Sequence, residues 1–358
     1  MDFTPDLSSI FSLVPLPTFY VKKGVITRAN PAASALLFSE GTRVSDFLGS
    51  NQWGYWEFTS GCLYMGIRRG SKILHVCVTR FNDGDLFVVE EAHEPNELRT
   101  LCVTATAMRQ PVSAVIATAG SMAELLKSNN DPKATEYIAQ MNRQLWRIHR
   151  MLCNMSDAAH FADDYVARLR TQNLTKFISE IFQKAQHYAL FCGINLVYSV
   201  PDTEVRCLID TQLIERAIYN MVSNAIKASD KGTSINASFT VKDTRLLISI
   251  QDQGRGIPTD RLGDLFKRYG RQPGVNDVEN GLGLGMVLIR CAALAHAGTV
   301  LIDHPEKVGT RVTLSFPMRV NKQALLYAQG LDVDYAGNWD HGLLEFADVL
   351  PAHLYEKC

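Results

Sequence analysis

The chain has 358 residues, of which 46% are hydrophobic and 20% charged, and its formal net charge is -1. This length predicts about two or three domains, and the composition is that of an ordinary soluble protein with enough apolar material for real cores. A net charge near zero gives no global field that would recruit nucleic acid or an anionic membrane. No apolar run approaches the ~20 residues that a membrane-spanning helix needs, so we expect no membrane contact.

The N-terminus and the cysteines both indicate a cytoplasmic protein. The first residues include Asp2 and Asp6 and lack the basic start of a signal peptide. The eight cysteines form no CxxC pair, and most lie in apolar segments. Free buried thiols in a reducing compartment are therefore the expected state, with metal binding as the minor alternative.

Residues 1–92 predict a small α+β sensor domain. A short helix should start at Pro31, capped by Asn30, because asparagine and proline suit those two positions. The turn Asn82-Asp83-Gly84 is a strong hairpin signal. Strands are expected at 19–21, 25–27, 62–68, 72–81 and 85–91.

This region resembles a PAS domain. The resemblance rests on residues 23–37, with their turn, strand, Asn-Pro pair and helix, and on the closing segment 81–91. It implies a pocket for a ligand or signal; the alternative is a packing and dimerisation module with a solid core. The aromatic residues that fit either role are Trp53, Tyr55, Trp56 and Phe58.

Two long helices, each with one apolar seam, are predicted between residues 97 and 159. Asn129-Asn130-Asp131-Pro132 breaks the helix between them. Because a hairpin with one narrow seam per helix buries little alone, two copies should close a four-helix bundle, and we predict a homodimer through residues 97–159. The steps of three and four that define the seams run through Leu98, Leu101, Ala105, Met108, Val112, Val115, Ala119, Met122 and Leu126, and through Ile138, Met141, Leu145, Ile148, Leu152, Met155 and Ala159.

This hairpin, residues 93–160, resembles the dimerisation and histidine-phosphotransfer element of sensor histidine kinases, chiefly through residues 108–126. In that family the sequence His-Glu-Leu-Arg stands just before the matched proline segment, and here Thr106-Ala107-Met108-Arg109 takes its place. Thr106 thus holds the phosphoacceptor position, off the seam and on a face that water can reach. A threonine hydroxyl is a poor nucleophile without a nearby base, and Ala107 cannot act as one.

The hairpin offers no replacement histidine. The sequence has none between His93 and His149, and for each of these two we expect an ordinary surface position. An alternative register that places residues 96–100 on the motif loses the match at Pro111 and still contains no histidine.

Residues 161–318 predict an α/β sandwich, in which helices cover one face of a mixed sheet and a nucleotide lies between the helices and a loop lid. Helices are expected at 174–192, 211–229 and 286–297, and strands at 195–200, 205–210, 234–241, 245–252, 299–303 and 310–316.

Three polar residues on the helix that begins at Thr211 have the spacing of a magnesium and phosphate site. Asn220 and Asn224 are four residues apart and therefore project from one face. A carboxamide oxygen is a neutral ligand that suits magnesium bound beside substrate phosphates, and Lys227, one turn later, can meet phosphate oxygens. The alternative of a solvated polar face loses weight because the helix is otherwise apolar there.

Two glycine boxes follow. Asp252 ends an apolar strand, where its carboxylate can accept from the exocyclic amine of adenine while the glycines after it let the backbone approach the ring. Three alternating glycines before a helix expose backbone N–H groups that form an anion cradle. The boxes contain Gly254 and Gly256, and Gly281, Gly283 and Gly285.

The region resembles the ATPase domain shared by histidine kinases, gyrase, the gyrase-like heat-shock chaperones and MutL proteins. The resemblance implies ATP and Mg²⁺ as cofactors, with Asn224 as the magnesium ligand and Lys227 as a phosphate contact. It further implies that Phe266 anchors the lid and that Thr310 lies near adenine. Asn220 stands where the hydrolytic members carry a glutamate base, as in histidine kinases; an amide cannot take a proton, so simple ATP hydrolysis is disfavoured.

Together these patterns predict a multidomain α+β protein with a PAS-like sensor (1–92), a helical hairpin (93–160), an ATP-binding domain (161–318) and a C-terminal tail (319–358) that packs on the ATP-binding domain or docks a partner. The leading hypothesis is a homodimeric, cytoplasmic, histidine-kinase-like protein that binds Mg-ATP, couples its input to phosphotransfer and works with a response regulator or partner kinase. The alternatives are a catalytically degenerate, ATP-dependent scaffold and a kinase that modifies Thr106.

Overall fold

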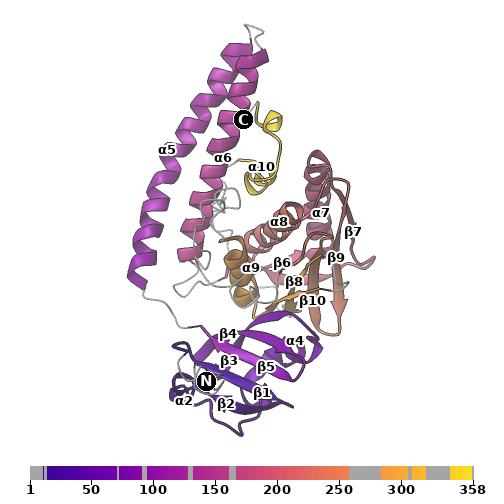
Figure 1. The fold of residues 1–358 in the computed structure, drawn as a ribbon. Coiled ribbons are helices and arrows are strands. Elements are labelled where there is room, and N and C mark those ends of the chain that lie inside the picture. Colours follow the sequence, from indigo (N-terminus) through magenta and orange to yellow (C-terminus); the bar gives the residue numbers. More distant parts are fainter. Residues whose placement is uncertain are drawn as a thin grey trace, which may run out of the picture.

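The computed structural model describes residues 11, 14–70, 72–90, 95–127, 132–160, 167–257, 284–304, 309–319 and 339–356. It has an N-terminal α/β unit, two long helices side by side, and a sheet covered by helices on one face (Figure 1). The C-terminal segment lies between the second long helix and the helices of the last unit. No helix in the described ranges has the length and apolar character needed to cross a membrane.

The N-terminal unit has a filled core. Asn30 accepts a hydrogen bond from the amide of Ala33 at 2.8 Å and so caps α2, with Pro31 at its first turn, as the sequence predicts. The rings of Phe19 and Phe87 stack with centroids 4.8 Å apart. The elements are β1 (Thr18–Lys22), β2 (Val25–Ala29), α2 (Pro31–Ala35), α3 (Ser45–Leu48), α4 (Gln52–Glu57), β3 (Cys62–Arg69), β4 (Lys72–Phe81) and β5 (Gly84–Val89).

The four aromatic residues for which the sequence allows either a pocket-lining or a core role do not all lie in the core. Tyr55 and Phe58 are buried in this core, whereas Trp53 is half-buried and Trp56 is 57% exposed. Trp53 instead lies beneath the side chains of Lys242 and Arg245 from the last unit.

The two long helices are α5 (Pro95–Lys127) and α6 (Pro132–His160), and they pack against each other. Their predicted seams divide between two faces. Ala105 and Ala119 are buried, but Met108, Val115 and Met122 are about half exposed. One face of α5 therefore packs within the chain, and a second apolar face remains at the surface. His149, expected at the surface, is only 3% exposed, because its side of α6 is covered.

The last unit has the predicted helices and strands in the predicted order, preceded by one strand, β6, that was not predicted. Helices α7, α8 and α9 cover one face of the sheet, and the apolar side chains of that face, such as Ile248 and Ile250, form the core beneath them. The elements are β6 (Arg170–Asn173), α7 (Leu174–Phe191), β7 (Asn195–Ser199), β8 (Arg206–Ile209), α8 (Thr211–Ala228), β9 (Ser234–Lys242), β10 (Arg245–Gln251), α9 (Leu284–Ala295), β11 (Thr299–Asp303) and β12 (Arg311–Pro317).

The sheets of the first and last units form one continuous sheet. Its strand order is β2-β1-β5-β4-β3-β11-β12-β10-β9-β7, and β6 pairs separately with β8. The junction is the antiparallel pair β3–β11, in which Met65 faces Thr299 and Cys62 faces Ile302. Every strand edge at this junction is thus paired within the chain. The sequence pattern treats the two units as separate and does not predict the junction.

The C-terminal segment is wedged beside α6. It forms α10 (His341–Glu345) and a 3-10 turn, η4 (Ala352–Tyr355). Trp146 of α6 contacts the rings of Trp339 and Tyr355, with centroids 5.3 and 5.8 Å away. Tyr188 of α7 donates a hydrogen bond to Asp340 at 2.8 Å. The segment therefore joins the helical pair to the last unit.

Candidate nucleotide-binding site

Helix α8 carries the polar residues of the candidate site. Asp210 caps its N-terminus by accepting from the amide of Leu213 at 3.2 Å. Most of its apolar side chains are buried, so the helix has a fixed orientation against the sheet. Asn220 and Asn224 consequently occupy fixed positions near the N-terminus of α9.

Asn220 is 1% exposed and fully engaged by the chain. Its Nδ2 donates to the carbonyl of Arg216 at 2.9 Å and to Glu345 Oε2 at 3.3 Å. Its Oδ1 accepts from Arg150 Nη2 at 3.2 Å. Asn220 thus joins α8 to α6 and to the C-terminal segment.

Asn224 lies one turn further along and is half-buried. Its Nδ2 contacts the sulfur of Met286 at 3.7 Å. A Cβ atom at Gly285 would lie 2.9 Å from Asn220 Oδ1 and 3.8 Å from Asn224 Nδ2. The last glycine of the second box is therefore needed for α9 to begin this close to both asparagines.

Asp252 directly follows β10 and is 5% exposed. Its Oδ1 accepts from the backbone amides of Gly254 at 2.9 Å and Thr310 at 3.1 Å. Burial raises the pKa of Asp252, and these two bonds oppose the rise because they stabilise the carboxylate. The predicted Asp252, Gly254 and Thr310 therefore do converge at one place in the fold.

The glycines of the first box fit against protein backbone. A Cβ atom at Gly254 would lie 2.1 Å from the carbonyl oxygen of Ala228, at the end of α8. Gly256 has a φ of +72°, in the left-handed region that favours glycine. These glycines bring the turn after β10 against the helix that carries Asn224.

Lys227 forms an ion pair with Asp348 of the C-terminal segment, with Nζ and Oδ2 2.7 Å apart. Burial lowers the pKa of Lys227, and the charge of Asp348 counteracts this. The predicted phosphate contact thus lies at the end of the site, where it is paired with a carboxylate of the same chain.

Comparisons with known proteins show to which families this chain is similar. Residues 209–320 match the family of histidine kinase-, DNA gyrase B-, and HSP90-like ATPases. The sensor histidine kinase WalK of Bacillus subtilis is 25% identical over 225 residues, which cover 60% of this chain and 36% of WalK. The sensor-like histidine kinase SenX3 of Mycolicibacterium smegmatis is 27% identical over 213 residues, 59% of this chain and 54% of SenX3. The chain is thus similar in sequence to sensor histidine kinases.

Solved structures show the same fold. The crystal structure of full-length ShkA in complex with AMPPNP aligns with 63% of this chain and 46% of that chain, with a TM-score of 0.51 and 20% sequence identity. This chain spans only 36% of WalK and 54% of SenX3. Part of each sensor histidine kinase therefore has no counterpart in it.

Several site residues that the histidine-kinase resemblance predicts lie outside the described residues. Phe266, Gly281 and Gly283 belong to the segment 258–283, so the lid is not described. Thr106 lies within α5, but its side chain is not among those described. The described part of the site is therefore Asn220, Asn224, Lys227, the turn after Asp252, Gly285 and Thr310.

Three charged residues at this site were not predicted from the sequence: Arg150, Glu345 and Asp348. A signal for two of them is visible in residues 343–350, Leu-Leu-Glu-Phe-Ala-Asp-Val-Leu, where carboxylates interrupt an otherwise apolar run. Buried carboxylates require partners, so this pattern indicates a cationic docking site elsewhere in the chain.

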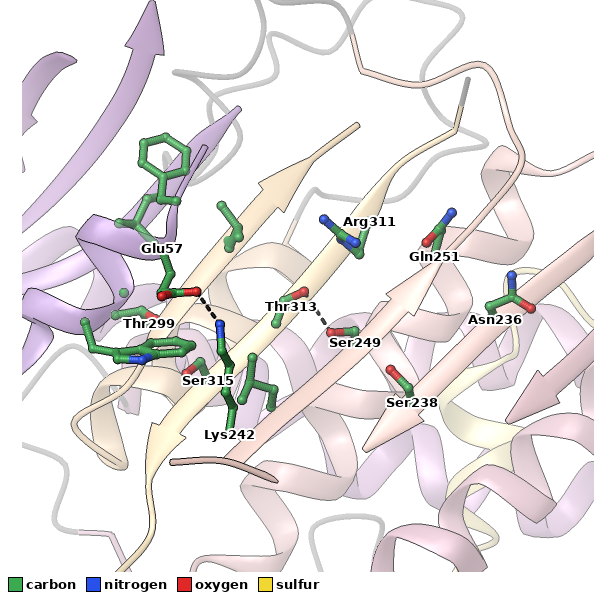
Figure 2. Close-up of a pocket in the computed structure, with 16 residues that line it drawn as sticks. Glu57, Asn236, Ser238, Lys242, Ser249, Gln251, Thr299, Arg311, Thr313 and Ser315 are labelled. Carbon is green, nitrogen blue, oxygen red and sulfur yellow. Dashed lines mark hydrogen bonds and ion pairs between the residues drawn. The ribbon is translucent and has the colours of Figure 1, made fainter. Parts of the chain in front are cut away.

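A cavity lies on the opposite face of the sheet (Figure 2). It has a volume of about 330 Å³ and lies between α4 and strands β9 to β12. Ser249 lines it and hydrogen-bonds Thr313 across the strands at 2.9 Å. Because Ser249 lies between the buried Ile248 and Ile250, the cavity is separated from the asparagines of α8 by the whole sheet.

Proposed function

We propose that this chain binds Mg-ATP between α8 and the turn after β10 and couples a PAS-like input to phosphotransfer in a two-component-type pathway. The observation that carries the proposal is the convergence of Asp252, Gly254 and Thr310 at the C-terminal end of α8, with Asn224 about one helical turn before that end and Gly285 beside it. Asp252 Oδ1 already accepts two backbone bonds. We therefore expect Oδ2 to accept from the amine of adenine.

The donor atoms at the phosphate end fit a magnesium ion held largely by phosphates. Mg²⁺ bound with a nucleotide takes few protein ligands, and a half-buried carboxamide suits it. Asn224 meets this requirement because its Nδ2 points to Met286, which leaves Oδ1 for the cation. Asn220 does not, since its amide is occupied by Arg150 and Glu345. When bound, the ion would balance the charge of the phosphates.

The expected fate of the γ-phosphate depends on whether Asn220 and Thr106 can act as a base or as a phosphate acceptor. Neither Asn220 nor Thr106 supplies a base or an acceptor histidine, so we expect neither rapid hydrolysis nor phosphorylation of this chain. The acceptor is then a histidine on a partner protein. A response regulator would act after that partner.

Labelling with γ-³²P-ATP tests this proposal. The purified chain alone should acquire no acid-labile, base-stable phosphate. When the wild-type chain is mixed with purified histidine-bearing hairpins of related kinases, one of these hairpins should become labelled. The Asp252→Asn variant should label none of them. If the chain binds Mg-ATP but labels no hairpin, the proposal of phosphotransfer is wrong.

The second candidate is a degenerate kinase that binds ATP as part of a dimeric scaffold. The observation that favours it is the ion pair of Lys227 with Asp348, which withdraws the predicted phosphate contact from the site. Under this proposal ATP changes how the chain assembles with partners and its γ-phosphate stays in place. The same labelling experiment separates the two, because a scaffold leaves every hairpin unlabelled while ATP is bound.

A third candidate is phosphorylation of Thr106 by the chain itself. A phosphothreonine is stable to acid, whereas a phosphohistidine is not. Acid-stable label that disappears in Thr106→Ala would therefore support it.

A further inference from the structure

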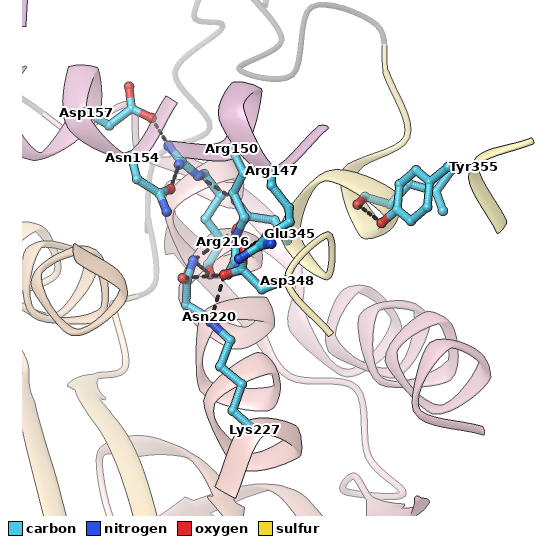
Figure 3. Close-up of polar contacts among 11 residues, drawn as sticks. Arg147, Arg150, Asn154, Asp157, Arg216, Asn220, Lys227, Glu345, Asp348 and Tyr355 are labelled. Carbon is cyan, nitrogen blue, oxygen red and sulfur yellow. Dashed lines mark hydrogen bonds and ion pairs between the residues drawn. The ribbon is translucent and has the colours of Figure 1, made fainter. Parts of the chain in front are cut away.

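Asp348 lies among three cations at the edge of the nucleotide site (Figure 3). Its Oδ2 is 2.7 Å from Lys227 Nζ of α8 and 2.7 Å from Arg150 Nη1 of α6. Its Oδ1 is 3.4 Å from Arg147 Nε. The carboxylate thus occupies a position that basic groups from two different parts of the chain approach together.

Asp348 is held there as a charged group. Its side chain is 14% exposed, and burial by itself would favour the neutral acid. The charges of Arg150 and Lys227 outweigh that effect and lower the pKa of Asp348 to about 2. The carboxyl of Asp348 is therefore a charged anion at neutral pH.

Glu345, one turn earlier, anchors the segment that delivers Asp348. It is fully buried and accepts from Arg150 Nε at 3.2 Å and Arg216 Nε at 3.0 Å. Arg216 also pairs with Asp157 of α6. The C-terminal segment is thus fastened by ion pairs to both α6 and α8.

The cluster has an excess of positive charge. It contains four cations, Arg147, Arg150, Arg216 and Lys227, against the three carboxylates of Asp157, Glu345 and Asp348, so its formal charge is 4 − 3 = +1. Without the two carboxylates of the C-terminal segment the balance becomes 4 − 1 = +3. Buried cations need anionic partners, so the cluster would then require another anion.

The cluster adjoins the phosphate end of the site. Arg150 donates to Asn220 Oδ1, the atom that a Cβ atom at Gly285 would approach to 2.9 Å. Lys227 lies on the same helix, one turn beyond Asn224. A nucleotide whose magnesium is held at Asn224 would therefore bring its terminal phosphate to the position of Asp348.

We propose that Arg147, Arg150 and Lys227 form an anion site for the terminal phosphate of ATP, and that Asp348 occupies this site until the nucleotide displaces it. The inference rests on the proposed function, since it requires ATP at α8. It adds two arginines of α6 to the nucleotide contacts. It also makes the C-terminal segment an internal competitor of ATP, whose release loosens α6 from α8.

The test is the affinity of the full-length chain for Mg-ATP and Mg-ADP, measured by calorimetry. Asp348→Asn should bind Mg-ATP about tenfold more tightly than wild type, the effect of one hydrogen bond between charged groups. The same substitution should increase the affinity for Mg-ADP less, because ADP lacks the terminal phosphate. The matched control is Asp202→Asn, which removes an exposed carboxylate outside the cluster, and it should leave the affinity unchanged. In a Lys227→Met background the gain from Asp348→Asn should shrink.

Hydrogen exchange of the wild-type chain tests, without any substitution, whether ATP releases the C-terminal segment. Saturating Mg-ATP should accelerate exchange of the amides of 343–347. Equal Mg-ATP affinities for wild type and Asp348→Asn, or unchanged protection of 343–347 with ATP bound, would overturn the anion site and leave the proposed function standing. Absence of ATP binding by every variant, Asp348→Asn included, would instead overturn the proposed function.

Discussion

At the scale of single residues, the candidate site depends on contacts that the sequence only partly predicts. Asp252 and the two glycines after it are identifiable because an acid at the end of an apolar strand, followed by glycines, is an unusual local pattern. The first glycine also has a role that the sequence does not predict: Gly254 makes room for the carbonyl of Ala228, at the end of α8. That contact joins residues far apart in the chain, so no local pattern reveals it.

His149 is the residue whose environment departs most from expectation. Both of its ring nitrogens are buried and lack a hydrogen-bond partner among the described residues. Burial, with a smaller contribution from the charge of Arg109, lowers the pKa of His149 from 6.5 to about 4. The histidine is therefore neutral in the folded chain at pH 7.

This burial predicts a loss of stability in mild acid. Because the unfolded chain takes up the proton near pH 6.5 and the folded chain only near pH 4, stability is complete above about pH 6.5 and falls as the pH drops towards 4, by up to about 3 kcal/mol. In calorimetric melts between pH 7 and 4.5, His149→Leu should lose less in melting temperature than wild type. The exposed His187→Leu should behave like wild type. An equal pH dependence for His149→Leu and wild type would refute this assignment.

At the scale of elements, the helical pair shows what a heptad pattern can and cannot predict. The steps of three and four correctly predict two long apolar helices. They do not separate the face of α5 that packs within the chain, with Ala105 and Ile116, from the face left exposed, with Val115 and Met122. Both faces are apolar and lie next to each other on the helix, so the sequence pattern shows one apolar seam and does not distinguish the two faces.

The exposed face predicts a dimer. In α5, Met108, Val115 and Met122 recur every seven residues and are 48%, 51% and 49% exposed. A stripe of this kind is stabilised when a second copy covers it, as in a four-helix bundle. Sedimentation of the full-length chain should show a dimer at micromolar concentration. The double substitution Val115→Glu and Met122→Glu should give a monomer, because it would bury charges at the interface.

The matched control for this experiment is Gln110→Glu, which places the same charge on an exposed polar position of α5 away from the stripe. It should remain dimeric. A wild-type chain that sediments as a monomer would contradict the bundle.

At the scale of the whole molecule, two features join the units of the chain. One sheet runs through the first and last units, and the C-terminal segment contacts both α6 and α8. Strands β3 and β11 are each recognisable from sequence, but their pairing joins residues more than two hundred positions apart. Glu345 and Arg150, which are 195 positions apart, likewise pair across the chain. Pairing between distant segments depends on how their complete surfaces fit together. Local sequence patterns therefore predict the individual helices and strands but not which of them pair.

The sheet junction predicts a selective effect of two glycine substitutions. Gly61 and Gly41 have nearly the same φ, +90° and +86°, so alanine strains the backbone similarly at both. A Cβ atom at Gly61 would also lie 2.0 Å from the carbonyl of Ile302 in β11, whereas Gly41 has no atom within 4 Å. Gly61→Ala should therefore separate β3 from β11.

Hydrogen exchange of the β11 amides reports this separation. Exchange should accelerate in Gly61→Ala and stay as in wild type in Gly41→Ala. Equal protection of β11 in both variants would show that the junction does not form as described.

The central claim, that Asp252 and Asn224 form an ATP site, is tested most directly by titrating the full-length chain with Mg-ATP in a calorimeter. Wild type should bind at one site. Asp252→Asn should bind at least about tenfold more weakly, because an amide replaces the charged acceptor of the adenine amine. The exposed Asp202→Asn, changed in the same way, should bind like wild type. No binding by the wild-type chain, or equal affinity for Asp252→Asn, would contradict the claim.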